Sequence, residues 1–242
     1  EGLEELKNLR TLTCTVEGDI DIESYSKIFG TEEGEKTLNI SSTRDLEGME
    51  LSDSVKIYDC DMSGRYRKNE IVQINKVLDE IRGLIKPGMS EEKKAEIIYR
   101  FLGTYISYDE EAQENKTNII RSRSLAGCLI DGFGVCAGLA KAMEMVLKDN
   151  GIEAKACGGY GDGNEHDFQE EPGNHQWLQV KIDNEWYWCD LTWDMCNEED
   201  FLRGNWKHFL KSDEAFFKDH SADPNDFPEK CTSKRFDEKH KW

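Results

Sequence analysis

Apolar residues recur at intervals of three and four in three stretches of the chain, a pattern typical of amphipathic helices. The first stretch runs from Ile71 to Ile85 and ends before Pro87 and Gly88, which break helices. The second follows Ser90, a suitable N-cap residue, and continues to about residue 107. The third begins near Cys136 and stops at Asn150 and Gly151. The pattern therefore predicts three helices between residues 71 and 150.

Alternation of apolar and polar residues predicts strands at 154–160, 175–182 and 185–193. Asp183 and Asn184 join the last two strands and have the chemistry of a two-residue hairpin turn. In that hairpin Ile182 pairs with Glu185, and the register brings His175 and Asp190 to one sheet face as diagonal neighbours. Such neighbours lie about 7–8 Å apart at Cα, within reach of a hydrogen bond between imidazole and carboxylate.

The opposite face of the predicted hairpin supplies a set of apolar side chains for core packing. This set is Leu178, Val180, Ile182, Tyr187 and Leu191. A slip of one residue would place His175 and Asp190 on opposite faces. The alternation therefore allows the face that carries His175 and Asp190 to border a cleft.

The rest of the chain gives weaker patterns. Residues from about 9 to 57 are rich in Thr, Ser, Gly and Asp, with β-type pieces at 10–16 and 54–58, and residues 1–65 are predicted to form a β-rich N-terminal attachment. We expect residues 66–242 to form the main core with a C-terminal extension. Residues 113–124 are predicted as a loop, and the tail after residue 197 as irregular chain with a candidate strand at 208–210.

Composition narrows the class of protein. The 242 residues are 33% charged and 37% hydrophobic, and they suit a globular protein that needs neither disulfide nor metal to fold. The net charge of −19 argues against a nucleic-acid partner. No apolar run approaches the roughly 20 residues of a membrane-spanning helix.

Eight cysteines are spread along the chain without a C-x-x-C pair, which gives no zinc or redox motif. We predict no metal and no cofactor. If the protein is secreted, Cys14 and Cys60 are candidates for a disulfide. The chain begins at Glu1 without Met or a signal segment, so we expect a mature or trimmed form.

Cys136 occupies the first turn of the third predicted helix, where the helix dipole and unpaired backbone N–H groups favour a thiolate. The same N–H groups are suited to stabilise an oxyanion. With His175 as base and Asp190 orienting it, the three residues have the roles of a catalytic triad. Taken singly, each has a structural alternative: a buried thiol, a satisfied strand histidine and a turn cap.

The blocks around these residues resemble the transglutaminase-like superfamily, in particular bacterial proteins with this domain. The blocks are G-V-C-A-G-L-A at 134–140, H-Q-W at 175–177 and W-Y-W-C-D-L-T-W-D at 186–194. The resemblance covers roughly residues 90–194, and more loosely 208–213 and 219–220. One departure is Gln176 and Leu178, where the family often has Ala and Asn; both are expected to point away from the site.

The resemblance implies an α+β, papain-like fold in which the helix bearing Cys136 packs on an antiparallel sheet bearing His175 and Asp190. It also implies attack on a protein or peptide amide and a thioester acyl-enzyme, which passes to water (protease or amidase) or to an amine (transglutaminase). The rival hypothesis is a non-catalytic module that binds a peptide or cell-wall component in the same cleft.

Two aromatic residues are candidates for supporting the site. Trp177, predicted opposite Asp190, could shield the bond between His175 and Asp190 from water or simply pack in the core. Tyr108 stands where the family often has an aromatic residue near the cleft. Trp193 and Trp206 are interpreted as packing residues. His166, His208, His220 and His240 have no predicted partner and are assigned solvated or capping roles.

The acidic loop at 161–173 is interpreted as a solvated rim, without the multi-Asp calcium loop of animal transglutaminases. The expected partner is a protein or peptide substrate, linked to a cell surface or cell wall. We expect an extracellular or surface location, with a cytoplasmic one left open.

Overall fold

The computed structural model describes residues 11–15, 22–29, 35–40, 50–52, 55–59, 64–162, 173–226 and 228–239. The chain divides into two compact units, Glu1–Val77 and Leu78–Trp242. This division falls inside helix α2 (Lys68–Leu84). The boundary expected between residues 65 and 66 stays a prediction.

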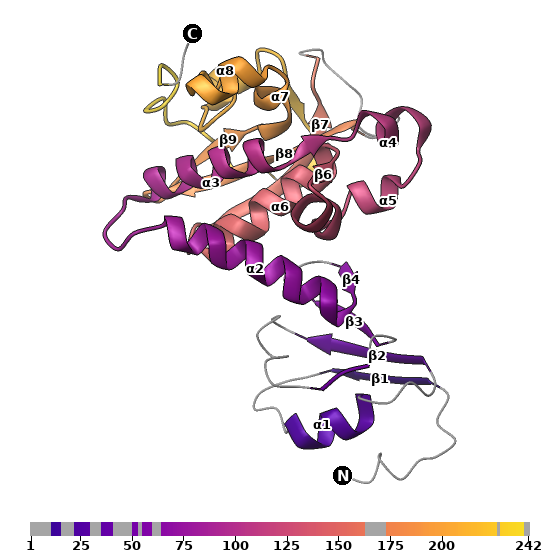
Figure 1. Cartoon of the computed structure of the whole chain (residues 1–242). Coiled ribbons are helices and arrows are strands. Elements are labelled where there is room, and N and C mark those ends of the chain that lie inside the picture. Colours follow the sequence, from indigo (N-terminus) through magenta and orange to yellow (C-terminus); the bar gives the residue numbers. More distant parts are fainter. Residues whose placement is uncertain are drawn as a thin grey trace. The chain divides into compact units, whose positions relative to one another are not determined.

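The first unit contains a four-stranded sheet in the order β1-β2-β3-β4 (Figure 1). The strands are β1 (Thr11–Thr15), β2 (Glu35–Ile40), β3 (Lys56–Asp59) and β4 (Gly64–Tyr66). The first three are parallel, and β4 runs antiparallel to β3. Parallel strands need a crossover connection, and helix α1 (Ile22–Phe29) lies in the one between β1 and β2. The sequence pattern predicted β-structure here but not this helix.

The three predicted helices are present. They are α2, α3 (Glu91–Tyr105) and α6 (Cys136–Asp149). The Ser90 hydroxyl caps α3 by accepting the backbone N–H of Lys93 at 3.2 Å. Beyond the end of α6, Gly151 takes a positive φ of 78°, which glycine adopts without steric cost. Capping and periodicity were therefore sufficient to place these helices.

The second unit is built on an antiparallel sheet in the order β10-β7-β8-β9. Its strands are β7 (Ala154–Tyr160), β8 (His175–Ile182), β9 (Glu185–Cys189) and β10 (Ser221–Ala222). Asp183 and Asn184 have φ values of 51° and 68°, as a tight hairpin turn with two left-handed residues requires. Ile182 pairs with Glu185, so the predicted register is confirmed.

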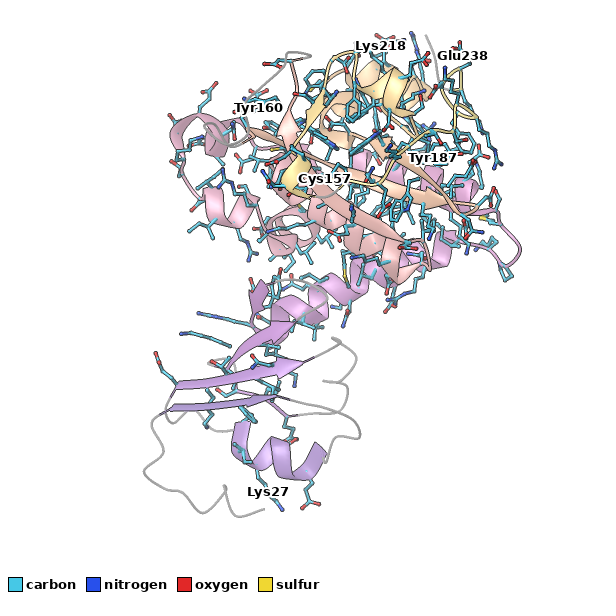
Figure 2. All side chains as sticks on the ribbon, turned by 180° about the vertical axis from the view of Figure 1, so that it is seen from behind. Lys27, Cys157, Tyr160, Tyr187, Lys218 and Glu238 are labelled. Carbon is cyan, nitrogen blue, oxygen red and sulfur yellow. The ribbon has the colours of Figure 1, made fainter. Side chains whose placement is uncertain are left out.

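Both faces of this sheet are covered. The apolar residues predicted for one face are all buried, and α6 packs on β8 from that side. On the other face Trp177 and Trp188 form a buried cluster with Phe216 and Cys231 from the C-terminal part of the chain. Cys157 of β7, labelled in Figure 2, belongs to the same cluster. The part of this face around Trp177 and Trp188 is therefore packed, whereas the His175 side chain at the start of β8 keeps 11% of its surface exposed, and a cleft beside His175 and Asp190 stays a prediction.

The C-terminal tail is more regular than predicted. It contains helices α7 (Leu191–Met195), α8 (Glu198–Arg203) and α9 (Asp213–Phe216), strand β10 and a 3-10 turn at Pro224–Asp226. The strand expected at 185–193 stops at Cys189, because Asp190 caps α7 and turns the chain. Residues 208–210 form no strand; a single bridge joins Trp188 to Lys211.

The stretch expected as a loop at 113–124 also contains helices. These are α4 (Glu110–Asn115) and α5 (Ile119–Ser122), followed by a π-helical turn at Gly127–Asp131. Two short strands, β5 (Ser107–Tyr108) and β6 (Phe133–Gly134), then pair in parallel just before Cys136. Among the residues described, no helix has the length and apolar character needed to cross a membrane.

The α+β class is confirmed: the helix that begins at Cys136 packs on an antiparallel sheet whose strands β8 and β9 lead to His175 and Asp190. The first turn of that helix sits very close to its neighbours. A Cβ at Gly138 would lie 2.3 Å from the carbonyl oxygen of Ser122. Glycine at this position therefore sets how closely the start of α6 approaches α5.

We expect Gly138→Ala to destabilise the protein by about 1–3 kcal/mol, because a methyl group has no room against the Ser122 carbonyl. Urea unfolding measures this loss. The control is Gly83→Ala in α2, where a Cβ meets nothing within 4 Å and a helical alanine is favourable. An unchanged unfolding midpoint for Gly138→Ala would contradict the packing described here.

Candidate active site

Cys136 is the first residue of α6, and Val135 before it makes no side-chain capping bond. The backbone N–H of Val135 donates to the carbonyl of Ser122 at 3.0 Å. Gly134 and Gly138 flank the cysteine, and a Cβ at Gly134 would lie 2.4 Å from the Sγ of Cys128. The glycines of the G-V-C-A-G block thus allow the segment that carries Cys136 to pack tightly on its neighbours.

The environment of Cys136 favours its thiolate. Burial raises the pKa of the thiol, but the hydrogen bond and charge of His175 and the backbone N–H groups of Gln176 and Ala137 lower it below its ordinary value. Burial raises the pKa of the other free cysteines that the structure describes. Within this described set, Cys136 alone has a lowered pKa.

His175 and Asp190 are in direct contact. The Nε2 of His175 lies 2.7 Å from the Oδ2 of Asp190, and the two side chains are 11% and 0% exposed. Since Asp190 occupies Nε2, the Nδ1 nitrogen is the one left for Cys136. Burial lowers the pKa of His175, but the bonds to Asp190 and Cys136 outweigh it and raise the pKa to about 10. The structure thus brings the three predicted residues together.

Asp190 holds more partners than the sequence predicted. Its Oδ1 accepts the backbone N–H of Trp193 at 3.2 Å, which caps α7. Its Oδ2 also faces the Nε2 of His220 at 3.1 Å. Burial raises the pKa of this carboxyl, but the imidazoles of His175 and His220 lower it well below its usual range. The carboxylate is therefore ionised and fixed in orientation.

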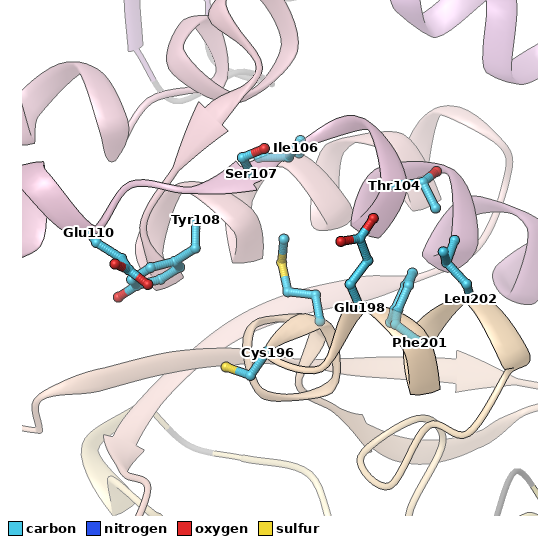
Figure 3. Close-up of a pocket in the computed structure, with 11 residues that line it drawn as sticks. Thr104, Ile106, Ser107, Tyr108, Glu110, Cys196, Glu198, Phe201 and Leu202 are labelled. Carbon is cyan, nitrogen blue, oxygen red and sulfur yellow. The ribbon is translucent and has the colours of Figure 1, made fainter.

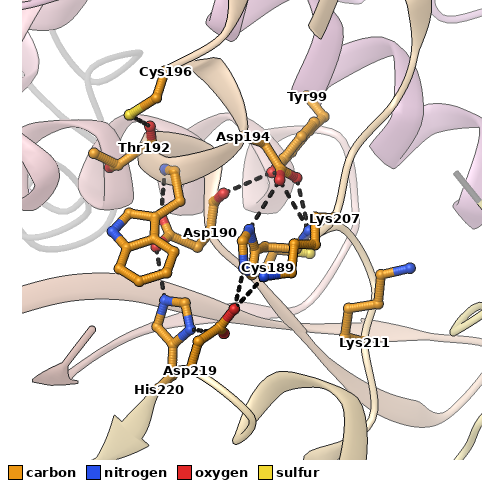
Figure 4. Close-up of polar contacts among 12 residues, drawn as sticks. Tyr99, Cys189, Asp190, Thr192, Asp194, Cys196, Lys207, Lys211, Asp219 and His220 are labelled. Carbon is orange, nitrogen blue, oxygen red and sulfur yellow. Dashed lines mark hydrogen bonds and ion pairs between the residues drawn. The ribbon is translucent and has the colours of Figure 1, made fainter. Parts of the chain in front are cut away.

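His220 begins a buried network that extends away from Asp190 (Figure 4). Its Nδ1 lies 2.8 Å from the Oδ1 of Asp219, whose Oδ2 lies 3.3 Å from the Nε2 of His208. The Nδ1 of His208 lies 3.0 Å from Asp194, and Asp194 accepts the hydroxyl of Tyr99 at 2.7 Å. A continuous set of hydrogen bonds therefore joins Asp190 to α3.

Both ring nitrogens of His208 and of His220 face carboxylate oxygens. Because a carboxylate only accepts, both contacts of His208 are hydrogen bonds when both of its ring nitrogens donate. The pKa of His208 agrees: burial lowers it, but Asp194 and Asp219 raise it to about 9. The prediction of solvated or capping roles for these two histidines is wrong, since both are buried. His166 and His240 lie outside the described residues, as does most of the acidic loop.

Two groups of these side chains have the types of atoms that could bind a metal ion, all within 4.8 Å of one another. One group is His175, Asp190 and His220, and the other is His208, Asp219 and His220. Their histidine–carboxylate contacts of 2.7–3.3 Å are hydrogen-bond distances. The donors and acceptors already satisfy one another without an ion. We therefore describe both groups as parts of the hydrogen-bonded network.

Two tryptophans enclose this network. The ring centroid of Trp177 lies 5.6 Å from that of His175 and 5.0 Å from that of His220. Trp193 lies 4.4 Å from His220 and 6.1 Å from His175. Trp177 also packs in the buried cluster with Trp188 and Phe216. Trp177 thus packs in the core and also lies against the His175 ring, and a shielding effect on the bond between His175 and Asp190 stays a prediction.

Tyr108 lies beside Cys136 and lines a pocket of about 470 Å³ (Figure 3). Burial and the nearby Cys136 raise the pKa of Tyr108 to about 12, so its hydroxyl is neutral at physiological pH. The pocket lies between the segment 103–110 and the segment 195–202, which begins at the last residue of α7. It is lined by Gly103, Thr104, Ile106, Ser107, Tyr108, Glu110, Met195, Cys196, Glu198, Phe201 and Leu202.

Residues 80–191 match the model of the transglutaminase-like superfamily, and this match contains Cys136, His175 and Asp190. This part of the chain belongs to the transglutaminase-like superfamily. No curated protein matches the chain.

Three solved structures are partly similar to this chain. A transglutaminase (TGase) is 18% identical with a TM-score of 0.42, over 51% of this chain and 31% of that one. A candidate protease from Parabacteroides distasonis is 14% identical with a TM-score of 0.36, over 50% and 25%. A candidate cysteine protease from Cytophaga hutchinsonii is 19% identical with a TM-score of 0.35, over 50% and 38%. The similarity thus spans well under two thirds of each of these proteins.

The partners of His220 and His208 could not be predicted from the sequence pattern, because no periodicity linked the tail to the sheet. One signal was available, since Asp219 stands directly before His220 and the block 219–220 weakly resembles the family. The proposed disulfide between Cys14 and Cys60 lies outside what the structure describes, because Cys60 is not placed and the side chain of Cys14 is not described.

The pKa shifts predict selective alkylation. At pH 7 iodoacetamide should modify Cys136 at least about tenfold faster than the exposed Cys196, since the pKa of Cys136 is lowered whereas burial and nearby carboxylates raise that of Cys196. Peptide mass spectrometry resolves the two sites. His175→Ala should slow Cys136 towards the rate of Cys196, and equal rates in the unaltered protein would contradict this environment.

The network also predicts a pH-dependent stability. The pKa of His208 is raised to about 9, above the roughly 6.5 of an unfolded histidine, so its stabilisation is complete below pH 6.5 and falls as pH rises towards 9. Between pH 6.5 and 8.5 the free energy of unfolding should fall by on the order of 2–3 kcal/mol because of this histidine. Urea unfolding of His208→Gln over this range should show a shallower decline. An identical slope would mean that His208 does not gain a proton on folding.

Proposed function

We propose that this protein catalyses cysteine-dependent acyl transfer on protein or peptide amides, with Cys136 as nucleophile, His175 as general base and acid, and Asp190 as the group that orients His175. The contact of 2.7 Å between the buried Asp190 and the ring of His175 carries the proposal, because it leaves the Nδ1 nitrogen free to serve the thiol at the start of α6.

In the first step the Cys136 thiolate attacks the carbonyl carbon of the amide, forming a C–S bond and placing negative charge on the carbonyl oxygen. The backbone N–H of Cys136 has no acceptor among the described residues and is available to stabilise that charge. The His175 imidazolium then gives its Nδ1 proton to the leaving nitrogen as the C–N bond breaks. An amine leaves and a thioester remains.

In the second step neutral His175 takes a proton from the incoming water or amine, which attacks the thioester carbon. The C–S bond breaks, and the Cys136 thiolate and His175 imidazolium form again. Asp190 stays ionised throughout, because its pKa lies far below the working range, and it stabilises the imidazolium of the resting state. Water yields hydrolysis, whereas an amine yields a new amide.

Tyr108 stays a candidate for contact with the substrate, since its neutral hydroxyl lies beside Cys136 at the pocket. We also propose that the substrate is a protein or peptide and that the protein acts outside the cell or at its surface. Fractionation of the source organism, followed by immunodetection of this chain, would test the location.

The decisive experiment incubates the protein with a glutamine-containing peptide and a labelled primary amine, and analyses the peptide by mass spectrometry. Incorporation of the amine indicates transfer, whereas deamidation or cleavage indicates hydrolysis. Cys136→Ala should reduce either product to the background level, because the thioester cannot form. Glu199→Gln, which changes an exposed residue outside the pocket lining, should retain activity.

The rival function is binding without turnover in the same cleft. It would be favoured if no peptide or protein amide is altered and if Cys136→Ala retains the biological function. A mass increase on Cys136 that corresponds to the acyl part of the substrate would contradict it, since a binding module forms no thioester.

A further inference from the structure

The pocket beside Tyr108 has walls that come from both sides of the proposed catalytic site. One wall includes β5, which pairs with β6 immediately before Cys136, and the backbone N–H of Asp109 donates to the carbonyl of Gly134 at 3.0 Å. The other wall includes Met195 and Cys196 at the end of α7, the helix that Asp190 caps. Any group bound here therefore lies next to the segments that carry the nucleophile and the orienting acid.

The lining of the pocket combines aliphatic surface with carboxylates. Ile106, Met195 and Leu202 offer apolar contacts, and Phe201 forms part of the lining. Glu110 and Glu198 add two carboxylates, and no Lys, Arg or His is among the described lining residues. This surface is complementary to an alkyl chain that ends in a positive charge.

Both carboxylates are exposed, and Glu110 lies close enough to Cys196 to raise the pKa of that thiol. Neither Glu110 nor Glu198 takes part in an ion pair or a side-chain hydrogen bond in the described part of the chain. The nearby Arg100 is engaged elsewhere, since its guanidinium donates to the carbonyl of Leu202 at 2.7 Å and lies 4.9 Å from the ring centroid of Trp206. Figure 3 shows the carboxylate of Glu198 pointing across the pocket towards Thr104, and Glu110 beside Tyr108.

The neighbouring Glu199 gives a useful contrast. Its carboxylate lies 2.5 Å from Arg203 on the same helix, and it does not line the pocket. An acidic residue in the first turn of α8 is favourable for the helix whichever way it points. Glu198 therefore differs from Glu199 in where its side chain points, and not in its favourable position in the first turn of α8.

We propose that this pocket binds a basic side chain of the substrate, an alkyl chain ending in an ammonium or guanidinium group, next to the amide that Cys136 attacks. The position of the amide rests on the proposed function, whereas binding of the basic side chain does not. With a volume of about 470 Å³, the pocket falls in the range of sites that hold small groups and side chains.

Cys196 provides a readout that requires no catalysis, because it is exposed and lines the pocket. In a Cys136→Ser background, N-ethylmaleimide modification of Cys196 is followed at pH 8.5 by peptide mass spectrometry. The probes are three short peptides that contain lysine, norleucine or glutamate at one position. The lysine peptide should slow modification by at least about fivefold at saturation, and the other two should have little effect.

Glu198→Gln should raise the concentration of lysine peptide needed for half-maximal protection by up to about fivefold, which corresponds to the loss of one charge pair near a surface. Glu199→Gln should leave protection unchanged. Equal protection by the norleucine peptide, no protection by any peptide, or no effect of Glu198→Gln would overturn the proposal. Because the assay uses an inactive background, a failure of the proposed chemistry would appear only in the separate turnover experiment.

Discussion

The Asp190 carboxylate is the group on which the arrangement of the site depends. It is fully buried, and a buried charge is tolerated only where donors replace the lost water. One oxygen caps α7 and the other receives His175 and His220, so the same side chain ends strand β9, starts the next helix and fixes the imidazole. Fold and candidate chemistry share one electrostatic requirement at this position.

The residues around Asp190 also depend on complete hydrogen bonding. His220 and His208 each bridge two carboxylates, and Trp177 and Trp193 cover the rings. In a water-poor environment such bonds are strong when complete and costly when broken. The sheet face next to Asp190 is consequently packed. Space for a substrate group near Cys136 lies instead in the pocket between segments 103–110 and 195–202.

Local rules predicted much of this structure. Apolar periodicity and caps located α2, α3 and α6, and the turn chemistry of Asp183 and Asn184 gave the hairpin register that relates His175 to Asp190. The approach of Cys136 to that hairpin could be inferred only from family resemblance, because it depends on packing between elements distant in sequence. The roles of His208 and His220 escaped prediction for the same reason, since their partners come from tertiary contacts. The short helices α4, α5 and α7 lack enough turns to show a periodic pattern.

The C-terminal cover of the sheet has a consequence for the order in which the site is completed. During synthesis the segment that carries Cys136, His175 and Asp190 emerges before His220 and Phe216, and chains generally begin to fold from the N-terminal side. Until those later residues dock, the carboxylate of Asp190 lacks one of its donors and the tryptophans of β8 and β9 lack their cover. A nascent chain therefore carries the nucleophile before its surroundings are assembled, and residues that are made later complete them.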